Sequence, residues 1–238
     1  MIKFVSGFVK NLFNLVGLDL IRISKRPKYS LLGLRNLTIK TIIDIGANRG
    51  QFAKYISAVF PEAHLYCFEP LKEPYSELNK WAKKQRKVKA LNFALGDKAG
   101  KLNIFHHCNH DRSSSFLKTT EICAKHYPLV QKQVAVPVDI ITLDNWFFSL
   151  SPLPGSDILI KLDVQGYENR VIRGGTKTFN VAKACIVEVS LDNLYDGQST
   201  FQEIASLLYD IGYHYVGNLK QTYGNYGHVL YIDAVFVK

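Results

Sequence analysis

A short apolar run, Thr41–Ile45, constrains the fold most, because it ends in the pattern Asp44-x-Gly46-x-x-x-Gly50. Glycine suits such a turn, since the backbone must bend sharply and approach a ligand without a side chain in the way. From this run onward, short apolar stretches alternate with stretches of helical periodicity. Strands separated by helices predict right-handed crossovers and a mostly parallel sheet, so we expect an α/β domain.

The predicted elements follow one another along most of the chain. Strands and extended segments are expected over Thr41–Ile45, His64–Phe68, Val88–Leu95, Lys101–His106, Val134–Leu143, Asp157–Val164, Ala184–Val189, Tyr213–Val216 and Val229–Val237. Helices are expected over Gln51–Phe60, Pro74–Lys84, Tyr167–Arg173 and a stretch from Thr200 to Tyr209. Thr200 with Glu203 makes a capping box for the last helix. The final two extended segments are expected to pair in antiparallel fashion, and residues 108–133 form a polar insertion.

The net charge of +10 is concentrated near the start of the chain, where residues 1–40 hold eight basic side chains and one acidic one. We predict a basic amphipathic helix and linker over residues 1–36 and a catalytic domain over residues 37–238. The helix either packs on the outside of the domain or lies, through residues 1–30, on an anionic membrane surface. Since little excess positive charge remains for the domain, no nucleic-acid partner is expected. The apolar stripe of the helix consists of Ile2, Val5, Phe8, Val9, Leu12 and Val16.

The cellular location is predicted from what the sequence lacks. No run of about 20 apolar residues is present, as a membrane-spanning helix would need, and Lys10 interrupts the apolar core that a signal peptide requires. The four cysteines are far apart and form no C-x-x-C pair, which favours reduced thiols. We therefore expect a cytoplasmic protein, with peripheral membrane contact as the alternative.

The spacing of the glycines and the position of Asp44 indicate the cofactor. A nicotinamide-binding loop usually reads G-x-G-x-x-G, and this loop does not. Asp44 would repel a pyrophosphate but attract an ammonium or sulfonium group, which favours S-adenosylmethionine over a dinucleotide. Glu69, at the end of the next strand, lies where an acidic residue holds a ribose diol. Taken singly, Asp44 could also cap a turn, and Glu69 could be a charge at a helix entry.

The predicted strand Asp157–Val164 is counted as the fourth of the sheet, because the two extended segments before it border the polar insertion. Its end carries the candidate catalytic groups in the pattern K-x-D-x-x-G-x-E. A hydroxyl acceptor must lose its proton to a general base as the methyl group moves, and Asp163 is the first candidate for that base. Lys161 would orient Asp163 or bind an acceptor oxygen. Glu168 is either a third catalytic group or a cap of the turn at Gly166. Glu188, at the end of the next strand, is a further acceptor-side candidate.

The histidine-rich stretch His106–His110 invites a metal interpretation. Its spacing matches no zinc-binding pattern, and the sequence shows no second ligand cluster. We therefore expect no metal ligands in this chain. The stretch is instead expected to lie near the acceptor pocket, beside Ser113–Ser115. Tyr195, Tyr223 and Tyr226 are candidates for a sugar-binding cleft or are ordinary surface tyrosines.

Five motifs follow one another along the chain: DIGANRGQF at 44–52, FEP at 68–70, NFALGD at 92–97, VDIITLD at 138–144 and IKLDVQGYE at 160–168. This ordered set resembles the FkbM-type S-adenosylmethionine-dependent methyltransferases. The resemblance implies a class I methyltransferase fold, a Rossmann-like three-layer sandwich whose mostly parallel, seven-stranded sheet has an antiparallel last strand. It also implies methyl transfer, usually to a hydroxyl oxygen of a sugar, a polyketide or a related metabolite.

By position, the resemblance places Gly46–Gly50 beside the methionine part of the cofactor, Glu69 beside the ribose and the turn at Asn92–Asp97 beside the adenine. The full set of cofactor-binding residues that it implies is Asp44, Gly46, Ala47, Asn48, Gly50, Gln51, Phe52, Glu69, Pro70, Asn92 and Ala94.

Two other classes compete with this prediction. A catalytically silent methyltransferase-like module, kept for binding or as a scaffold, is the alternative, although the intact loop and the Lys161, Asp163 and Glu168 set speak against it. A nicotinamide oxidoreductase is disfavoured by the glycine spacing. The expected partner is a small-molecule or glycan acceptor, chosen by the insertion over residues 105–133 and the loops at 192–200 and 218–228. The sequence leaves open the identity of that acceptor, its reacting atom, whether a divalent metal assists, the oligomeric state and the role of the N-terminal helix.

Overall fold

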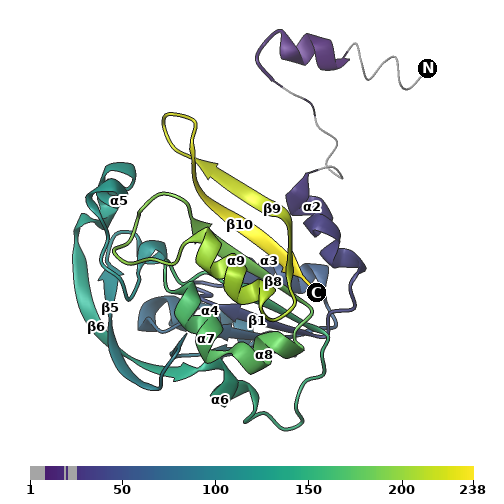
Figure 1. The fold of residues 1–238 in the computed structure, drawn as a ribbon, viewed down its shortest axis with the longest axis vertical. Helices are drawn as coiled ribbons and strands as arrows, with labels where there is room; N and C mark the ends of the chain where they lie inside the picture. The colour runs from purple at the N-terminus through teal and green to yellow at the C-terminus, as the bar shows by residue number, and fades with distance from the viewer. Residues whose placement is uncertain (1–8, 19, 21–25) are drawn as a thin grey trace.

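The computed structural model describes residues 9–18, 20 and 26–238 of the chain (Figure 1). Within these residues, a sheet of seven strands has the order β3-β2-β1-β7-β8-β10-β9. Its first five strands are parallel, whereas β10 runs antiparallel to both β8 and β9. The predicted class I methyltransferase sheet with its reversed last strand is therefore confirmed. The strands are β1 (Thr41–Ile45), β2 (His64–Phe68), β3 (Val88–Leu91), β7 (Ile158–Leu162), β8 (Ala184–Ser190), β9 (His214–Tyr223) and β10 (Val229–Val237).

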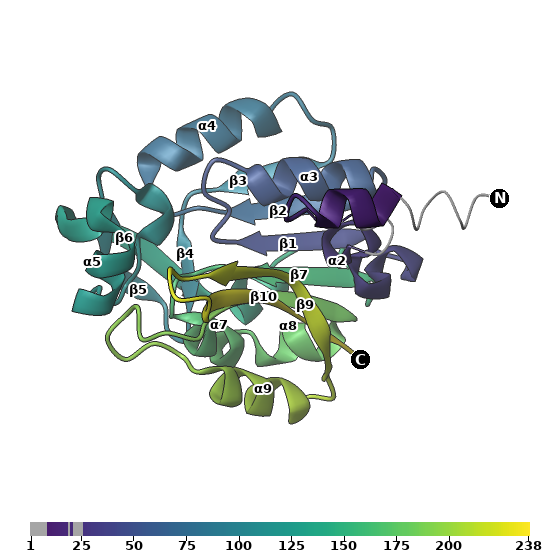
Figure 2. The ribbon, with the colours of Figure 1, turned by 90° about the horizontal axis from the view of Figure 1, so that it is seen from above.

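Helices cover both faces of this sheet and give the predicted three layers (Figure 2). On β1, Ile42 packs with the first helical layer and Ile43 with the second, and every residue of the strand is buried. Such a strand reads as a continuous apolar run because both of its faces are covered. The first layer holds α3 (Gln51–Val59), α4 (Lys72–Ala82) and the 3-10 helix η2 (Leu31–Asn36); the second holds α6 (Leu143–Phe147), α7 (Glu168–Gly174), α8 (Thr176–Val181) and α9 (Phe201–Tyr209).

A second, smaller sheet was not anticipated. It has the order β4-β6-β5 and consists of β4 (Ala94–Gly96), β5 (Gly100–His107) and β6 (Gln133–Thr142). The single strand predicted over Val88–Leu95 is wrong, because β3 and β4 belong to different sheets. The side-chain amide of Asn92 explains the break: it donates to the carbonyl oxygens of Glu69 (2.9 Å) and Pro70 (3.0 Å), which turns the chain between the two strands.

The polar insertion has short helices of its own. They are η3 (Asp111–Ser113), α5 (Glu121–His126) and η4 (Pro128–Gln131). The hydroxyl of Thr120 accepts a hydrogen bond from the Cys123 N–H and caps α5. Cys123 and Val130 then pack against Leu194 and Tyr195, which follow β8. The insertion is therefore fixed to the loop after β8, far from it in the sequence.

The four helices predicted from residue 51 onward are present as α3, α4, α7 and α9, with differences near their ends. The second predicted helix, α4, begins at Lys72 and not at Pro74; proline is tolerated in the first turn, where its missing N–H needs no partner. Helices α6 and α8 were missed, and Asp144 of α6 caps α8 by accepting from the Thr178 N–H at 2.8 Å. Half of the predicted capping box of α9 is present. The Thr200 hydroxyl accepts from the Glu203 N–H, but the Glu203 carboxylate accepts from Asn169 and Arg173.

Residues before the predicted domain boundary take part in the core. Helix α2 (Pro27–Ser30) leads into η2, whose Leu31 and Leu34 are each 1% exposed and pack beneath the sheet. Residues 9–14 are helical, and the side chains of Leu12 and Val16 are 56% and 70% exposed. The described part of the apolar stripe is thus exposed and not packed on the domain; Ile2, Val5 and Phe8 lie outside the described residues. The boundary between residues 36 and 37 stays a prediction.

None of the helices in the described ranges has the length and apolar character needed to cross a membrane.

Candidate active site

A cavity of about 370 Å³ lies at the carboxyl ends of β1, β2, β7 and β8. In an open α/β sheet this edge, where the strand order reverses, is where ligands bind. The cavity extends from the loop after β1 to the ends of β8 and β10, so the predicted cofactor and acceptor regions share one space. The predicted site residues in its wall are Gly46, Ala47, Asn48, Gln51, Phe52, Glu69, Pro70, Ala94, Lys161 and Asp163. The buried residues Asp44, Gly50 and Glu168 and the exposed Asn92 do not line the cavity.

The loop after β1 is shaped by its two glycines. Gly46 has φ +82°, and a β-carbon there would lie 1.9 Å from the carbonyl oxygen of Asp163, so no other residue fits. The N–H groups of Gly46 and Ala47 both donate to the carbonyl oxygen of Phe68, at 3.0 and 2.9 Å. Gly50, with φ +83°, begins α3. The loop is thereby tied to the ends of both neighbouring strands and presents its backbone to the cavity.

Glu69 is buried and held by the backbone around it. One carboxylate oxygen accepts from the Asn48 N–H at 2.9 Å and the other from the Leu71 N–H at 2.8 Å. Burial raises the pKa of Glu69 to about 7, although these two hydrogen bonds oppose the rise. Each oxygen keeps a second lone pair, and the side chain lines the cavity. The carboxylate can therefore accept from a ligand hydroxyl while it anchors the loop.

Asp44 lies directly below the loop, fully buried and paired in register with Lys161 of β7. Within the described part of the chain, neither of its carboxylate oxygens has a hydrogen-bond partner. Burial raises the pKa of Asp44 to about 7, and the charge of Lys161 opposes that rise. A buried carboxylate without hydrogen bonds is uncommon and points to a nearby cationic group.

The acceptor end of the cavity contains a hydrogen-bonded chain of side chains. Lys161 Nζ donates to one oxygen of Asp163 at 2.8 Å, and the Gln165 amide donates to the other at 2.7 Å. The same amide donates to Glu188 at 2.6 Å. Tyr195 OH donates to the Gln165 side-chain carbonyl at 2.6 Å. All five side chains line the cavity, so the fourth-strand motif and Glu188 belong to one network.

The charges of neighbouring groups determine which side chains of this network are ionised. Burial alone would lower the pKa of Lys161, but Asp163, Asp44 and Glu188 together raise it. Burial alone would raise the pKa of Asp163, but the ammonium of Lys161 and its hydrogen bond lower it. Burial and the Asp163 charge raise the pKa of Glu188 well above its ordinary value. Lys161 and Asp163 therefore form an ion pair, and Glu188 beside them holds its proton more tightly than an ordinary glutamate.

Glu168 lies beneath the turn that follows β7. One oxygen accepts from the N–H groups of Val164 (3.2 Å) and Gly166 (3.1 Å), and the other accepts from the Ser199 hydroxyl (3.0 Å). Burial raises the pKa of Glu168 to about 7 against these hydrogen bonds. These contacts are those of a turn cap, the alternative that the sequence left open.

Several site residues were missed by the sequence analysis. Gln165 lies within the fourth-strand motif, and its backbone has φ +55°. Nothing in the sequence predicts this conformation for a glutamine. Lys220, Tyr231 and Asp233 reach the cavity from β9 and β10. Of the histidine stretch, His110 lines the cavity. The ring of His107 is buried instead and lies 2.6 Å from the carbonyl oxygen of Val130.

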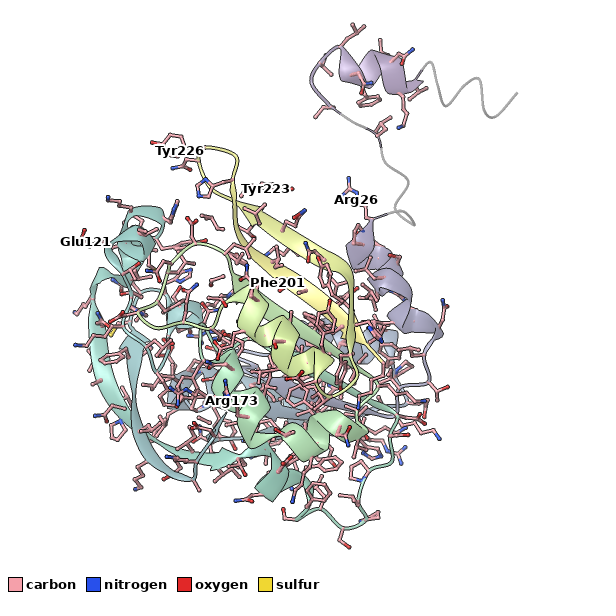
Figure 3. All side chains as sticks on the ribbon, in the orientation of Figure 1. Arg26, Glu121, Arg173, Phe201, Tyr223 and Tyr226 are labelled. Atoms are coloured by element: carbon pink, nitrogen blue, oxygen red, sulfur yellow. The ribbon has the colours of Figure 1, made fainter. Side chains whose placement is uncertain are left out.

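The candidate sugar-binding tyrosines separate into two groups. Tyr195 lines the cavity, as described above. Tyr223 and Tyr226 lie near the tip of the β9–β10 hairpin (Figure 3), with exposed fractions of 59% and 93%, and do not line the cavity.

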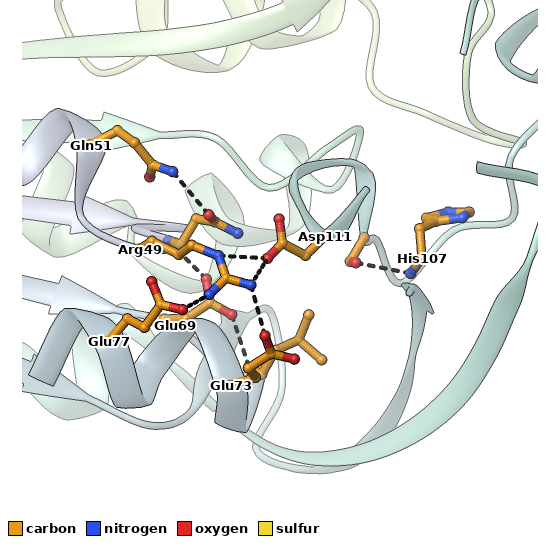
Figure 4. A network of polar contacts seen from close by, with 10 residues as sticks. Arg49, Gln51, Glu69, Glu73, Glu77, His107 and Asp111 are labelled. Atoms are coloured by element: carbon orange, nitrogen blue, oxygen red, sulfur yellow. Dashed lines mark hydrogen bonds and ion pairs between the residues drawn. The ribbon is translucent and has the colours of Figure 1, made fainter. Parts of the chain in front are cut away.

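Arg49 joins the cofactor loop to the insertion (Figure 4). Its guanidinium contacts Asp111 of η3 at 2.8 Å, Glu73 of α4 at 3.0 Å and also Glu77 of α4. Residues that follow Asp111, through Ser115, form one side of the cavity. Arg49 therefore holds the insertion over the loop that carries Asn48 and Gly50, a role that no motif indicated.

The strand order, the glycine turn and the cavity at the strand ends define a class I methyltransferase. A sequence model of the methyltransferase FkbM domain matches residues 44–215, which is most of the chain. This protein belongs to the FkbM methyltransferase family and is an S-adenosylmethionine-dependent methyltransferase. The nicotinamide alternative is thereby set aside.

Known proteins give a consistent comparison. The 2-O-methyltransferase NoeI of Sinorhizobium fredii (strain NBRC 101917 / NGR234) is 30% identical over 173 residues, or 70% of each protein. Among solved structures, precorrin-6y C5,15-methyltransferase from Geobacter metallireducens GS-15 has 16% identity and a TM-score of 0.43, covering 88% of this chain and 85% of that one. An Aquifex aeolicus SAM-dependent methyltransferase has 12% identity and a TM-score of 0.42, covering 91% and 94%. The fold assignment rests on the strand order and not on these scores.

Proposed function

We propose that this protein transfers a methyl group from S-adenosylmethionine to a hydroxyl oxygen of a sugar, in a small molecule or a glycan. The observation that carries the proposal is the single cavity that joins the Gly46 loop to Lys161, Asp163 and Glu188. Reactants held in one such space gain much of their rate from proximity and orientation. The relative NoeI is named a 2-O-methyltransferase, which supports a hydroxyl acceptor.

The residues present fit the cofactor. The backbone of the glycine turn lines the cavity, and Asp44 below it is a buried carboxylate without hydrogen-bond partners, which an ammonium or sulfonium group would stabilise in its charged form. Glu69 can accept from the ribose hydroxyls. Phe93 and Ala94, with Leu95 behind them, form an apolar wall where the adenine would lie. The cofactor, when bound, supplies an electrophilic methyl carbon.

The residues of this chain then accept the proton that the acceptor hydroxyl must lose. As the carbon–oxygen bond forms and the carbon–sulfur bond breaks, the acceptor oxygen becomes positively charged and its hydrogen strongly acidic. Asp163, kept ionised by Lys161, accepts that proton although its pKa is lowered, because the transfer occurs late. Gln165 and Lys161 fix both carboxylate oxygens, so the remaining lone pairs point in defined directions.

Two measurements test the proposal. Calorimetry with S-adenosylmethionine should show binding by the unaltered protein, loss of binding for Asp44→Ala and Glu69→Ala, and normal binding for Glu62→Gln, a control at an exposed carboxylate. Incubation of oligosaccharides with radiolabelled cofactor should then label a hydroxyl. Absence of cofactor binding would overturn the proposal, and binding without transfer to any acceptor would favour the silent binding module.

We also propose that residues 1–30 contact an anionic membrane surface, which the exposed Leu12 and Leu15 and the local basic charge support. The full chain should sediment with vesicles containing phosphatidylserine, and the double variant Leu12→Glu with Leu15→Glu should not. Equal sedimentation of the two proteins would refute the proposal. A chain that begins at Leu37 is a poor test, because Leu31 and Leu34 belong to the core.

A further inference from the structure

Three side chains from distant parts of the sequence meet beside the acceptor end of the cavity. His126 ends α5, Asp192 follows β8, and His228 directly precedes β10. The same carboxylate oxygen of Asp192 lies 3.0 Å from Nε2 of His228 and 3.4 Å from Nε2 of His126. Figures 1 and 2 both place α5 and the β9–β10 turn at the same end of the molecule.

The geometry of this cluster matches a tetrahedral metal ion. One ligand atom from each of the three side chains lies within 4.8 Å of the others. Metal–ligand bonds of about 2.0–2.1 Å to zinc place tetrahedral ligand atoms about 3.3 Å apart. The two separations between Asp192 and the histidines, 3.0 and 3.4 Å, are already close to that value.

The backbone around the cluster is built to hold it. The Asp192 carbonyl oxygen accepts from the Leu194 N–H at 2.9 Å and from the Gln198 amide at 2.8 Å. The Gly224 N–H donates to the His228 carbonyl oxygen at 2.8 Å. A β-carbon at residue 224 would lie 2.8 Å from the His228 ring, so the glycine at this position avoids a clash with the imidazole.

We propose that His126, Asp192 and His228 bind a divalent transition-metal ion, with zinc the best fit to two nitrogens and one carboxylate oxygen. The exposed fractions of the side chains rise from 16% for His126 to 41% for His228, which leaves the fourth position to water. The ion joins the insertion, the loop after β8 and the β9–β10 hairpin. It stabilises the acceptor side of the cavity, where Tyr127, Ser190 and Tyr231 lie close by in the sequence.

The cluster departs from the expectation of no metal ligands. That expectation concerned the stretch His106–His110 and the absence of a second cluster in the sequence. Side chains at positions 126, 192 and 228 share no spacing motif, and only the folded chain brings them together.

Metal content is the direct test. Cys108 is an exposed thiol that could bind zinc by itself, so all proteins carry Cys108→Ser and no histidine tag. Equilibrium dialysis against Zn²⁺ should give one ion per chain. His126→Ala, His228→Ala and Asp192→Asn should each weaken binding at least tenfold. His214→Ala, an exposed histidine of β9 outside the cluster, should bind like the parent.

Two readouts independent of methyl transfer complete the test. Co²⁺ should give the visible absorption of a nitrogen- and oxygen-ligated ion in the parent and in His214→Ala, but not in the cluster variants. Zn²⁺ at a hundredfold excess over Kd should raise the melting temperature of the parent by about 5 °C or more. Zinc-free parent protein after dialysis, or equal zinc binding by the cluster variants and His214→Ala, would overturn the proposal whatever the outcome of the cofactor experiments.

Discussion

Gly46 and Asp163 touch through their backbones, so closely that a β-carbon on residue 46 would lie 1.9 Å from the Asp163 carbonyl oxygen. This contact joins the end of β1 to the end of β7. It also sets the predicted cofactor loop directly against the residue proposed as the general base. The two halves of the site therefore depend on one glycine for their relative position.

Gly46→Ala should damage both stability and cofactor binding. The substitution adds a β-carbon where a carbonyl oxygen lies and also strains φ at +82°, so we expect a loss of about 2–4 kcal/mol in the free energy of unfolding. Urea denaturation and calorimetry with S-adenosylmethionine measure the two effects. Gly155→Ala is the control, because a β-carbon there has open space. Equal behaviour of the two variants would contradict the close approach.

Glu168→Gln should change the pH dependence of stability. The pKa of Glu168 is raised from 4.5 to about 7 in the folded protein, so the folded state holds a proton that the unfolded state loses above pH 4.5. The stabilisation of the folded state by this protonated carboxyl is complete at low pH and is lost as the pH rises to 7. Glutamine stays neutral and can keep the contacts with Val164, Gly166 and Ser199.

In urea denaturation, Glu168→Gln should therefore gain stability relative to the unaltered protein between pH 5 and pH 8, by up to about 3 kcal/mol. Both proteins share the other buried carboxylates, so the difference between their curves isolates Glu168. Parallel curves over this range would show that its folded pKa is not raised.

Asp163→Asn should separate chemistry from cofactor binding. The asparagine side chain cannot take the acceptor proton, so kcat should fall by roughly 100-fold or more. Affinity for S-adenosylmethionine should change less than fivefold or so, because the cofactor loop is intact. Single-turnover kinetics and calorimetry give the two quantities. If Asp163→Asn retains its kcat, another group acts as the general base, and Glu188 is the next candidate within the same network.

Arg49→Met should loosen the insertion. The substitution removes the contacts of Arg49 with Glu73, Glu77 and Asp111, so residues 106–116 should exchange amide hydrogens faster. Each exposed pair contributes little to global stability, and we expect a loss below about 1 kcal/mol. Hydrogen–deuterium exchange by mass spectrometry measures the effect, with exposed Arg86→Met as the control. Unchanged exchange would show that the insertion is held by its other contacts, such as the apolar packing on Leu194 and Tyr195 and the hydrogen bond from Ser115 to the Gln165 carbonyl oxygen.

The sequence predicted those parts of the fold whose signals are local. The five-residue strand Thr41–Ile45 is buried on both faces, so its apolar run was unambiguous. The break between β3 and β4 was not predictable in this way, because it depends on a contact between Asn92 and the carbonyl oxygens of Glu69 and Pro70. Helix α8 was missed for a similar reason: its cap is Asp144, which lies in α6.

The same distinction applies to the site. The glycine loop, Glu69 and the fourth-strand pair could be located because each is a compact motif at a strand end. Lys220, Tyr231 and Asp233 could not, since they reach the cavity only through the pairing of β9 and β10 with the sheet. The role of Arg49 depends on Asp111, which lies in η3 of the insertion, and no spacing rule links the two residues.

The position of β10 has a consequence for the synthesis of the chain. This strand is the last in the sequence but lies between β8 and β9 in the sheet. When synthesis has reached only the end of β9, that strand has no partner in the sheet, because β9 pairs with β10 and not with β8. The acceptor side of the cavity can therefore form only after residues 229–237 have left the ribosome, while the loop around Gly46 can order much earlier.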